Sequence, residues 1–260
     1  DVVKLLERLI SSQYTCMSVN LHHLKGWTPT ALFSILSAAK PEHHLYYVHD
    51  YFAICPQYNL LRNQREFCNA PDVESNSCTI CTFSQKRKVH QPFVKELFSR
   101  FPFSIITPSE SSLALWKKAY PEFTHEVRVV PHLLLNETAF TLPVKNYEKI
   151  RIAYVGQASP HKGWDVWRKF VDQFASNKEY ELFHLGKWVG SYPEYFENVR
   201  VSPTDRSAML EALRRNQIDV VFQWAIWPET FSYVLYEAIG AGCFILTSQL
   251  SGNVAEFVAK

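Results

Sequence analysis

Short apolar runs alternate with amphipathic stretches along most of this chain, and that alternation constrains the fold more than any other feature. YTCMSVNL (14–21) and KIRIAYVG (149–156) are typical of strands, and KGWDVWRKFVDQFA (162–175) is typical of a helix. Strands that alternate with helices predict βαβ units and therefore parallel sheets. We expect an α/β protein whose ligands bind at the carboxyl ends of its strands.

The pattern predicts two such layers. Further strands are expected at 44–50, ending near 107, near 127, and at 181–186, 198–202, 218–224 and 243–248, with helices at 29–39, from about 109, at 206–216 and at 230–240. The stretch 136–149 is polar and has no periodicity, so we place a domain boundary there. The prediction is two Rossmann-like domains, 1–140 and 141–260, with a long polar loop at 53–90.

Composition excludes two classes of protein. The 260 residues are 47% apolar and 20% charged, and their formal net charge is only +2. This balance is globular and carries no electrostatic footprint of nucleic-acid binding. The sequence contains no run of 18 apolar residues, so we predict no membrane span, and we recognise no signal peptide before the amphipathic stretch DVVKLLERLI.

The segment YVGQASPHKGWD (154–165) has the residue types of a phosphate site. Gly156 makes a turn after a strand, and Lys162 stands at the start of a helix. The free N–H groups and positive dipole end of a helix favour phosphate, and the ammonium group adds a point charge. The plain alternative is a solvated lysine beside a helix start.

The segment WPETFSYVLYEAIGAG (227–242) has two carboxylates around a helix start. Pro228 restricts the backbone before it, so Glu229 lies in the turn after a strand, while Glu237 follows about two turns into the helix. Carboxylates there suit the hydroxyl groups of a sugar or ribose. The plain alternative is a helix-capping Glu229 and a surface-exposed Glu237.

Together these segments resemble the bacterial-type retaining glycosyltransferases of family 4, which have the GT-B fold. The resemblance rests on VGQASPHKG, on the E-x7-E spacing before AIGAG, and on SGNVAEFV (251–258) as the following turn and helix. It covers 150–258 well and the first half more loosely, where HDYFAICPQYNLL (49–61) resembles a His-Asp segment of some members. It implies that the N-terminal domain of this chain is truncated.

The resemblance implies transfer of a sugar from a nucleotide-diphosphate donor with retained anomeric configuration and no required cofactor. The diphosphate leaves with negative charge, which fixed donors and cations must stabilise. The implied catalytic residues are His49 and Glu229, and the implied residues for nucleotide-sugar binding are Gly156, Gln157, Lys162, Phe231, Ser232, Tyr233 and Glu237.

Two positions depart from the family pattern. Gln157 stands where the family has an arginine paired with the lysine, so one cation is missing. The alternatives are weaker diphosphate binding, or replacement of the arginine by Lys187 or His161. Ser232 stands where the family has a glycine, and its hydroxyl could cap the helix or bind a phosphate.

Four of the six cysteines, Cys55, Cys68, Cys78 and Cys81, have the spacing C-x12-C-x9-C-x2-C. The CTIC pair has the spacing at which two thiolates reach one tetrahedral zinc ion, and a metal would order a long polar loop. Free thiols or disulfides are the alternatives. The neighbouring basic run QKRKVH (85–90) is predicted to be a solvated face, or else a contact for anionic lipid headgroups.

The sequence therefore predicts a cytoplasmic glycosyltransferase, with peripheral association at the inner membrane face as an addition. Its partners would be a nucleotide sugar and a glycan or lipid-linked acceptor, and not nucleic acid. The alternative functions are a glycosyltransferase-like binding or assembly subunit without transfer activity, and a zinc-stabilised scaffold.

Overall fold

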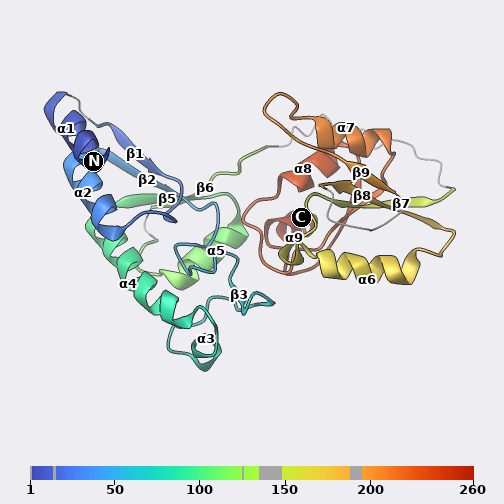
Figure 1. The fold of residues 1–260 in the computed structure, drawn as a ribbon, viewed down its shortest axis with the longest axis horizontal. Coiled ribbons are helices and arrows are strands. Elements are labelled where there is room, and N and C mark those ends of the chain that lie inside the picture. The colour runs from blue at the N-terminus through green and yellow to red at the C-terminus, as the bar shows by residue number, and fades with distance from the viewer. Residues whose placement is uncertain (1, 14–15, 125, 135–147, 188–194) are drawn as a thin grey trace. The chain divides into compact units, whose positions relative to one another are not determined.

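The structure, a computed structural model, describes residues 2–13, 16–124, 126–134, 148–187 and 195–260 (Figure 1). The chain divides into two compact units, Asp1–Pro131 and His132–Lys260. The predicted boundary at 140/141 lies outside the described residues. None of the described helices is both long enough and apolar enough to cross a membrane.

Unit 1 is built on a parallel sheet with the strand order β1-β2-β5-β6. These strands are β1 (Ser18–Leu21), β2 (His43–Tyr47), β5 (Phe103–Thr107) and β6 (Val127–Val129). The helices are α1 (Val2–Gln13), α2 (Pro29–Ala39), α4 (Ser84–Arg100) and α5 (Glu110–Ala119). Between β2 and α4 lie an antiparallel pair, β3 (Leu61–Arg62) and β4 (Glu66–Phe67), and the single turn α3 (Asn76–Thr79).

Local signals start two helices of unit 1 where the sequence predicts them. Thr28 Oγ1 accepts a hydrogen bond from the N–H of Ala31 at 3.3 Å, and Pro29 begins α2. Ser109 and Ser112 form a capping box at the start of α5. Both helices therefore begin within a residue or two of the sequence prediction.

An aromatic cluster fills the core of unit 1. The ring centroids of Tyr46 in β2 and Phe98 in α4 are 5.2 Å apart, and those of Phe98 and Trp116 in α5 are also 5.2 Å apart. All three side chains are buried. Burial of each aromatic ring stabilises the unit by about 1.5–3 kcal/mol, so this cluster holds two helices to the sheet.

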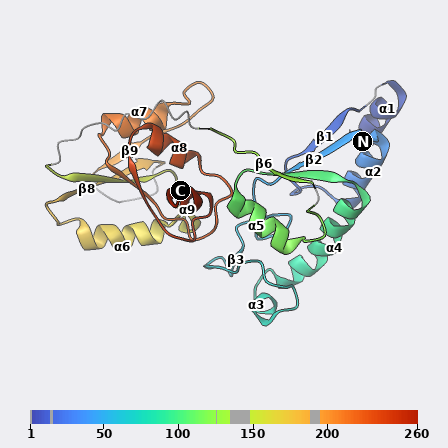
Figure 2. The ribbon, with the colours of Figure 1, turned by 180° about the vertical axis from the view of Figure 1, so that it is seen from behind.

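Unit 2 is built on a parallel sheet with the strand order β11-β10-β7-β8-β9. Figure 2 shows this unit with α6 and α7 beside the sheet. The strands are β7 (Ile150–Val155), β8 (Tyr180–Gly186), β9 (Phe196–Asn198), β10 (Val220–Gln223) and β11 (Phe244–Thr247). The helices are the 3-10 turn η2 (Pro160–Lys162), α6 (Trp164–Phe174), α7 (Ala208–Arg215), α8 (Tyr233–Gly240) and α9 (Asn253–Val258).

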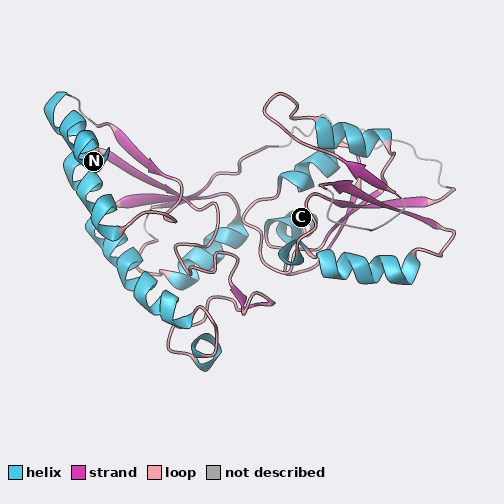
Figure 3. Ribbon diagram, in the orientation of Figure 1, coloured by secondary structure: helices cyan, strands magenta, loops and turns pink. Residues whose placement is uncertain are grey.

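The two faces of this sheet are covered by different helices (Figure 3). In β7, Ile152 and Tyr154 pack with Trp167 of α6 on one face. Ala153 lies between them in sequence and packs with Leu213 of α7 in the cluster on the other face, where α8 also contributes. Successive side chains of a strand point to opposite faces, so one apolar run supplies both cores.

The strand predicted at 198–202 is wrong by two residues, because the ladder to β8 is made by β9, Phe196–Asn198. The Phe196 ring packs against His184 of β8 at 5.1 Å, whereas Val201 is 47% exposed. Val199, the residue that follows β9, still packs against the core and its N–H donates to the carbonyl oxygen of Gly186 at 3.2 Å, so the valine alternation contributes only at its start.

The predicted loop at 53–90 is also wrong in its last part, because α4 begins at Ser84. The polar run QKRKVH belongs to this helix. Only a narrow face of α4 is buried, and Arg87, Val94 and Phe98 lie on it at helical spacing, so the sequence shows little apolar periodicity here. The basic run is therefore not a continuous solvated face: Lys86 is exposed, but Arg87 is 3% exposed.

Candidate functional site

In unit 2, the carboxyl ends of β7 and β10 are where a ligand is expected. The chain runs from β7 outward to β8 and β9, and then returns to the other side of β7 as β10. The connections that leave β7 and β10 lead to α6 and α8, which cover opposite faces. Such a switch point opens a crevice in sheets of this kind. Lys162 lies on the first connection and Glu229 on the second.

Lys162 and Glu229 form an ion pair of 2.5 Å between Nζ and Oε1 across 67 residues of sequence. The lysine side chain is 44% exposed, but the glutamate side chain is 2% exposed. The second carboxylate oxygen, Oε2, is buried and has no hydrogen-bond partner among the residues that the structure describes. Leaving such an acceptor unpaired costs about 1–3 kcal/mol, so this oxygen is poised to accept a hydrogen bond from a ligand. Glu229 does not cap α8, since Ser232 occupies the N-cap position.

Gly163 lets the two connections lie close together. Its φ is +81°, a left-handed conformation that favours glycine, and a Cβ atom there would lie 1.9 Å from the carbonyl oxygen of Trp224. The chain after β7 therefore packs directly against the chain after β10, which brings Lys162 within reach of Glu229.

A second turn, at the start of α9, supports the backbone around Glu229. The N–H of Asn253 donates to the carbonyl oxygen of Glu229 at 2.9 Å, and the N–H of Ser232 donates to Asn253 Oδ1 at 3.0 Å. Gly252 has a φ of +62°, and a Cβ atom there would lie 2.6 Å from the backbone N and O of Glu229. Sequence reasoning missed Asn253, although the Gly-Asn pair before a short helix was a usable signal.

The first turn of α8 carries no side-chain cap among the described residues. The Ser232 hydroxyl instead accepts a hydrogen bond from Gln223 Nε2 at the end of β10. Tyr233 is 56% exposed, and Phe231 stacks on Tyr236 with ring centroids 4.8 Å apart. The uncapped N–H groups of this turn have the orientation and partial charge that suit an anion.

His132 also lies at this end of unit 2. Its ring packs edge-on against Phe231 at 4.9 Å and lies nearly parallel to Tyr233 at 6.1 Å. Burial lowers the pKa of His132, which favours the neutral ring at pH 7.

Glu237 is half-buried on α8, so it is not the surface charge of the plain alternative. Burial raises the pKa of its carboxyl group from 4.5 to about 7. No hydrogen bond or ion pair of the side chain is seen among the described residues, so the carboxylate keeps its acceptor capacity for a ligand.

The turn after β7 contains the predicted glycine, Gly156, followed by Gln157 at the position where the family has a positively charged arginine. Gly156 has a φ of +101°, and its carbonyl oxygen is 3.0 Å from His184 Nε2. Gln157 is exposed. Burial, and then the charge of Lys162, lower the pKa of His161, which favours the neutral ring at pH 7. Lys187 is exposed just after β8.

In unit 1, two histidine contacts join the segments that follow β1 and β2, and His49 takes part in one of them. His22 Nδ1 lies 2.9 Å from His49 Nε2, and His23 Nε2 lies 2.7 Å from Asp50 Oδ2. The N–H of Lys25 donates to His23 Nδ1 at 2.8 Å. The proton of a neutral His23 is therefore on Nε2, which donates to Asp50 and fixes the chain beside His49.

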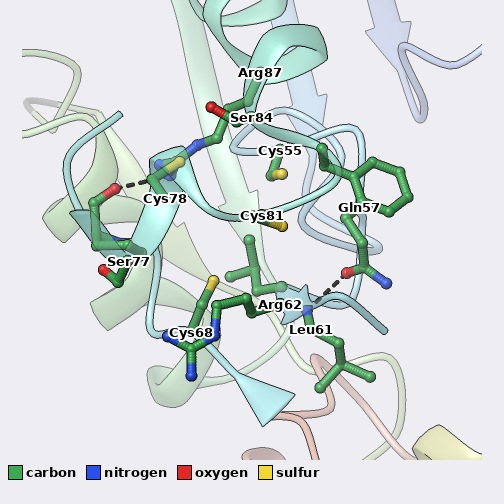
Figure 4. Close-up of a pocket in the computed structure, with 13 residues that line it drawn as sticks. Cys55, Gln57, Leu61, Arg62, Cys68, Ser77, Cys78, Cys81, Ser84 and Arg87 are labelled. Atoms are coloured by element: carbon green, nitrogen blue, oxygen red, sulfur yellow. Dashed lines mark hydrogen bonds between the residues drawn. The ribbon is translucent and has the colours of Figure 1, made fainter. Parts of the chain in front are cut away.

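All four cysteines of the predicted zinc loop line one cavity of about 20 Å³ (Figure 4). Burial raises the pKa of the Cys55 thiol to about 11, and the nearby Cys68 and Cys81 add to that shift. In the part of the chain that the structure describes, however, no three His, Cys, Asp or Glu side chains gather closely enough to form a ready-made metal site. The side-chain positions therefore do not support the predicted zinc ion as they stand.

Comparison with known proteins shows the fold. No protein-family model and no curated protein matches the sequence. Among solved structures, the chain is similar to Anabaena Alr3699/HepE, crystallised in complex with UDP-glucose, with a TM-score of 0.53, 14% identity, and coverage of 99% of this chain and 70% of that one.

Two other solved structures are similar. TarM matches with a TM-score of 0.57 and 10% identity over 98% of this chain and 45% of its own. The GtfA/B complex matches with a TM-score of 0.57 and 13% identity over 95% of this chain and 44% of the matched chain. This chain thus spans less than half the length of both. These neighbours are glycosyltransferases of the GT-B fold. The predicted fold class is confirmed: the chain is an α/β protein of GT-B type, with parallel sheets flanked by helices.

Proposed function

We propose that this chain belongs to a retaining glycosyltransferase of family 4 that transfers a sugar from a nucleotide-diphosphate donor to a glycan or glycolipid acceptor. The observation that carries the proposal is the Lys162–Glu229 ion pair at the switch point of unit 2, with one buried carboxylate oxygen left unsatisfied. The GT-B fold and the UDP-glucose bound to one structural neighbour support the same donor class.

Each group has a proposed role in donor binding. Lys162 Nζ and the start of α8, at Phe231, Ser232 and Tyr233, would hold the diphosphate as negative charge develops on it. The Ser232 N–H is already bonded to Asn253 Oδ1, so Ser232 would border the diphosphate rather than donate this N–H to it. Glu229 Oε2 would accept a hydrogen bond from a sugar hydroxyl. Because the lysine and the helix end supply positive charge, this arrangement does not require a divalent cation.

Three further roles complete the proposal. Glu237 would bind the ribose hydroxyl groups, and the Gly156–Gln157 turn would border the donor. His49 is the proposed acid–base or hydrogen-bonding group from unit 1, where His22 and the His23–Asp50 contact support it.

The proposed location is cytoplasmic, with peripheral membrane association through exposed basic residues such as Lys86.

A second candidate function is a binding or assembly subunit that has the fold but does not transfer sugar. Gln157 favours it, because this exposed amide cannot supply the cation expected there, and the lowered pKa of the neighbouring His161 favours its neutral form. The GtfA/B neighbour was solved as a complex.

Calorimetric titration with UDP, GDP and dTDP tests the proposed donor site. One preferred nucleotide should bind, and Lys162→Met should weaken its binding at least 10-fold, because the ammonium group contacts the diphosphate. Lys169→Met is the matched control, since Lys169 is exposed on α6. Binding without transfer to any acceptor would favour the assembly subunit, and no binding of any nucleotide at millimolar concentration would contradict both candidates.

A further inference from the structure

A buried arginine, Arg87, lines the cavity of the four cysteines. Arg87 is 3% exposed, yet its guanidinium group has no carboxylate partner among the described residues. Its Nε donates to the carbonyl oxygen of Ile54 at 3.3 Å, and its Nη1 donates to the carbonyl oxygen of Pro71 at 2.8 Å. Neutral carbonyl groups orient a guanidinium group but do not balance its charge, and a buried cation calls for a buried anion.

The third contact of Arg87 is with a cysteine sulfur, which is anionic when the thiol loses its proton. Nη1 also donates to Cys78 Sγ at 3.2 Å, inside the cavity that Cys55, Cys68 and Cys81 share (Figure 4). Arg87 thus contacts one cysteine sulfur directly, and the other three cysteines line the same cavity. A zinc ion with four thiolates has a net charge of 2−, which one guanidinium group partly offsets.

The cavity also has the size for one ion. Its volume of about 20 Å³ exceeds the minimum of about 10–15 Å³ that a single water molecule needs. The surrounding segment holds only the two-residue strands β3 and β4 and the one-turn helix α3, and the rest is a series of turns. Backbone hydrogen bonds of these turns place the cysteines, as in Cys68 N–H to the carbonyl oxygen of Leu60 at 2.9 Å and Cys81 N–H to that of Cys78 at 3.0 Å. Among the described residues no three of these side chains gather closely enough to hold an ion, so binding requires cysteine side chains to rotate about χ1 toward the cavity.

We propose that Cys55, Cys68, Cys78 and Cys81 bind one zinc ion as thiolates, with Arg87 as the buried counter-charge. Four thiolates in a closed tetrahedral set select zinc over harder cations. The ion would order the segment that follows His49 and Asp50, and this inference is independent of the proposed glycosyltransfer.

The first experiment uses the unmodified chain, isolated without chelators and with zinc in the medium. Elemental analysis should give about one zinc per chain. Alkylation of the folded protein followed by peptide mass spectrometry should label Cys16 and spare the four cavity cysteines until a chelator is added. A zinc content near zero with the four thiols labelled from the start, a disulfide among them, or iron with acid-labile sulfide would each overturn the proposal.

Paired variants test the ligands and the counter-charge. Cys81→Ser changes a half-buried ligand and should abolish stoichiometric zinc, whereas Cys16→Ser should retain it. Arg87→Met should weaken zinc binding about 10–100-fold in competition with a chromogenic chelator, as loss of an outer-shell partner does. Lys88→Met removes an adjacent charge that is paired with Glu74 outside the cavity and should leave the affinity unchanged. Equal affinities of the two charge variants would overturn the role of Arg87, and full zinc content in Cys81→Ser would overturn the ligand set.

Discussion

Asn253 links two segments of unit 2 by contacting both Glu229 and Ser232. Its backbone N–H donates to the Glu229 carbonyl oxygen at 2.9 Å, and its side-chain Oδ1 accepts from the Ser232 N–H at 3.0 Å. Both contacts hold the turn that carries the buried carboxylate, so the position of Glu229 depends on a residue 24 positions further along the chain.

Asn253→Ala should therefore lower the free energy of unfolding by about 1–3 kcal/mol, because it leaves the buried Ser232 N–H without its acceptor. Chemical denaturation measures this change, and nucleotide titration should show weaker binding. Asn198→Ala, at an exposed position in the edge strand β9, is the control and should change neither quantity. Equal stabilities of the two variants would show that Asn253 does not support the turn.

The Lys162–Glu229 pair makes a double-mutant cycle informative. Lys162→Met should destabilise the chain by about 1–3 kcal/mol, because it leaves a buried carboxylate without its cation; the half-exposed lysine keeps the loss below that of a fully buried pair. Glu229→Gln removes the charge and should cost less. The double variant should be more stable than Lys162→Met alone, as measured by denaturant unfolding. Strictly additive effects would contradict a coupled pair.

Glu237 should make stability depend on pH between about 4.5 and 7. Its pKa is raised in the folded state, so the folded chain retains a proton that the unfolded chain releases above pH 4.5. Stability from this group is therefore fully present below pH 4.5 and is lost as pH rises through about 7. Glu237→Gln should remove this loss, a gain on the order of 1–2 kcal/mol at pH 8, since partial exposure screens the effect.

Although Glu237→Gln should raise stability at pH 8, it should lower the affinity for the nucleotide. If the ionised carboxylate accepts hydrogen bonds from ribose, nucleotide affinity of the unmodified chain should rise with pH through about 7, and the variant should bind weakly at every pH. Glu179→Gln, at an exposed position before β8, is the control. A nucleotide affinity that is equal in both variants would remove Glu237 from the donor site.

His49→Ala should lower sugar transfer about 100-fold while nucleotide affinity changes less than about 2-fold, because His49 is in unit 1 and the proposed donor contacts are in unit 2. His43→Ala removes an exposed histidine at the other end of β2 and should leave both quantities unchanged. Steady-state kinetics with the preferred nucleotide sugar measures transfer. Unchanged turnover in His49→Ala would remove this residue from the reaction.

Much of the fold could be predicted because local signals decide it. The apolar run of β7 contributes to the cores on both faces of the sheet, and Thr28 and Ser109 start their helices. These signals act within a few residues, so the sequence alone reports them. The strand β9 and the start of α4 were placed wrongly, because Phe196 joins the sheet through its contact with His184 and α4 buries only a narrow stripe.

The sequence by itself determined the α/β class, the order of most elements, and which connections carry Lys162, Glu229 and Glu237. Only the tertiary structure decided that Lys162 pairs with Glu229, that Asn253 holds the turn between them, and that Arg87 is buried against Cys78. The physical reason is that periodicity and capping are properties of neighbouring residues. Burial, pairing of charges and unsatisfied polar atoms depend on segments that meet only after the chain has folded.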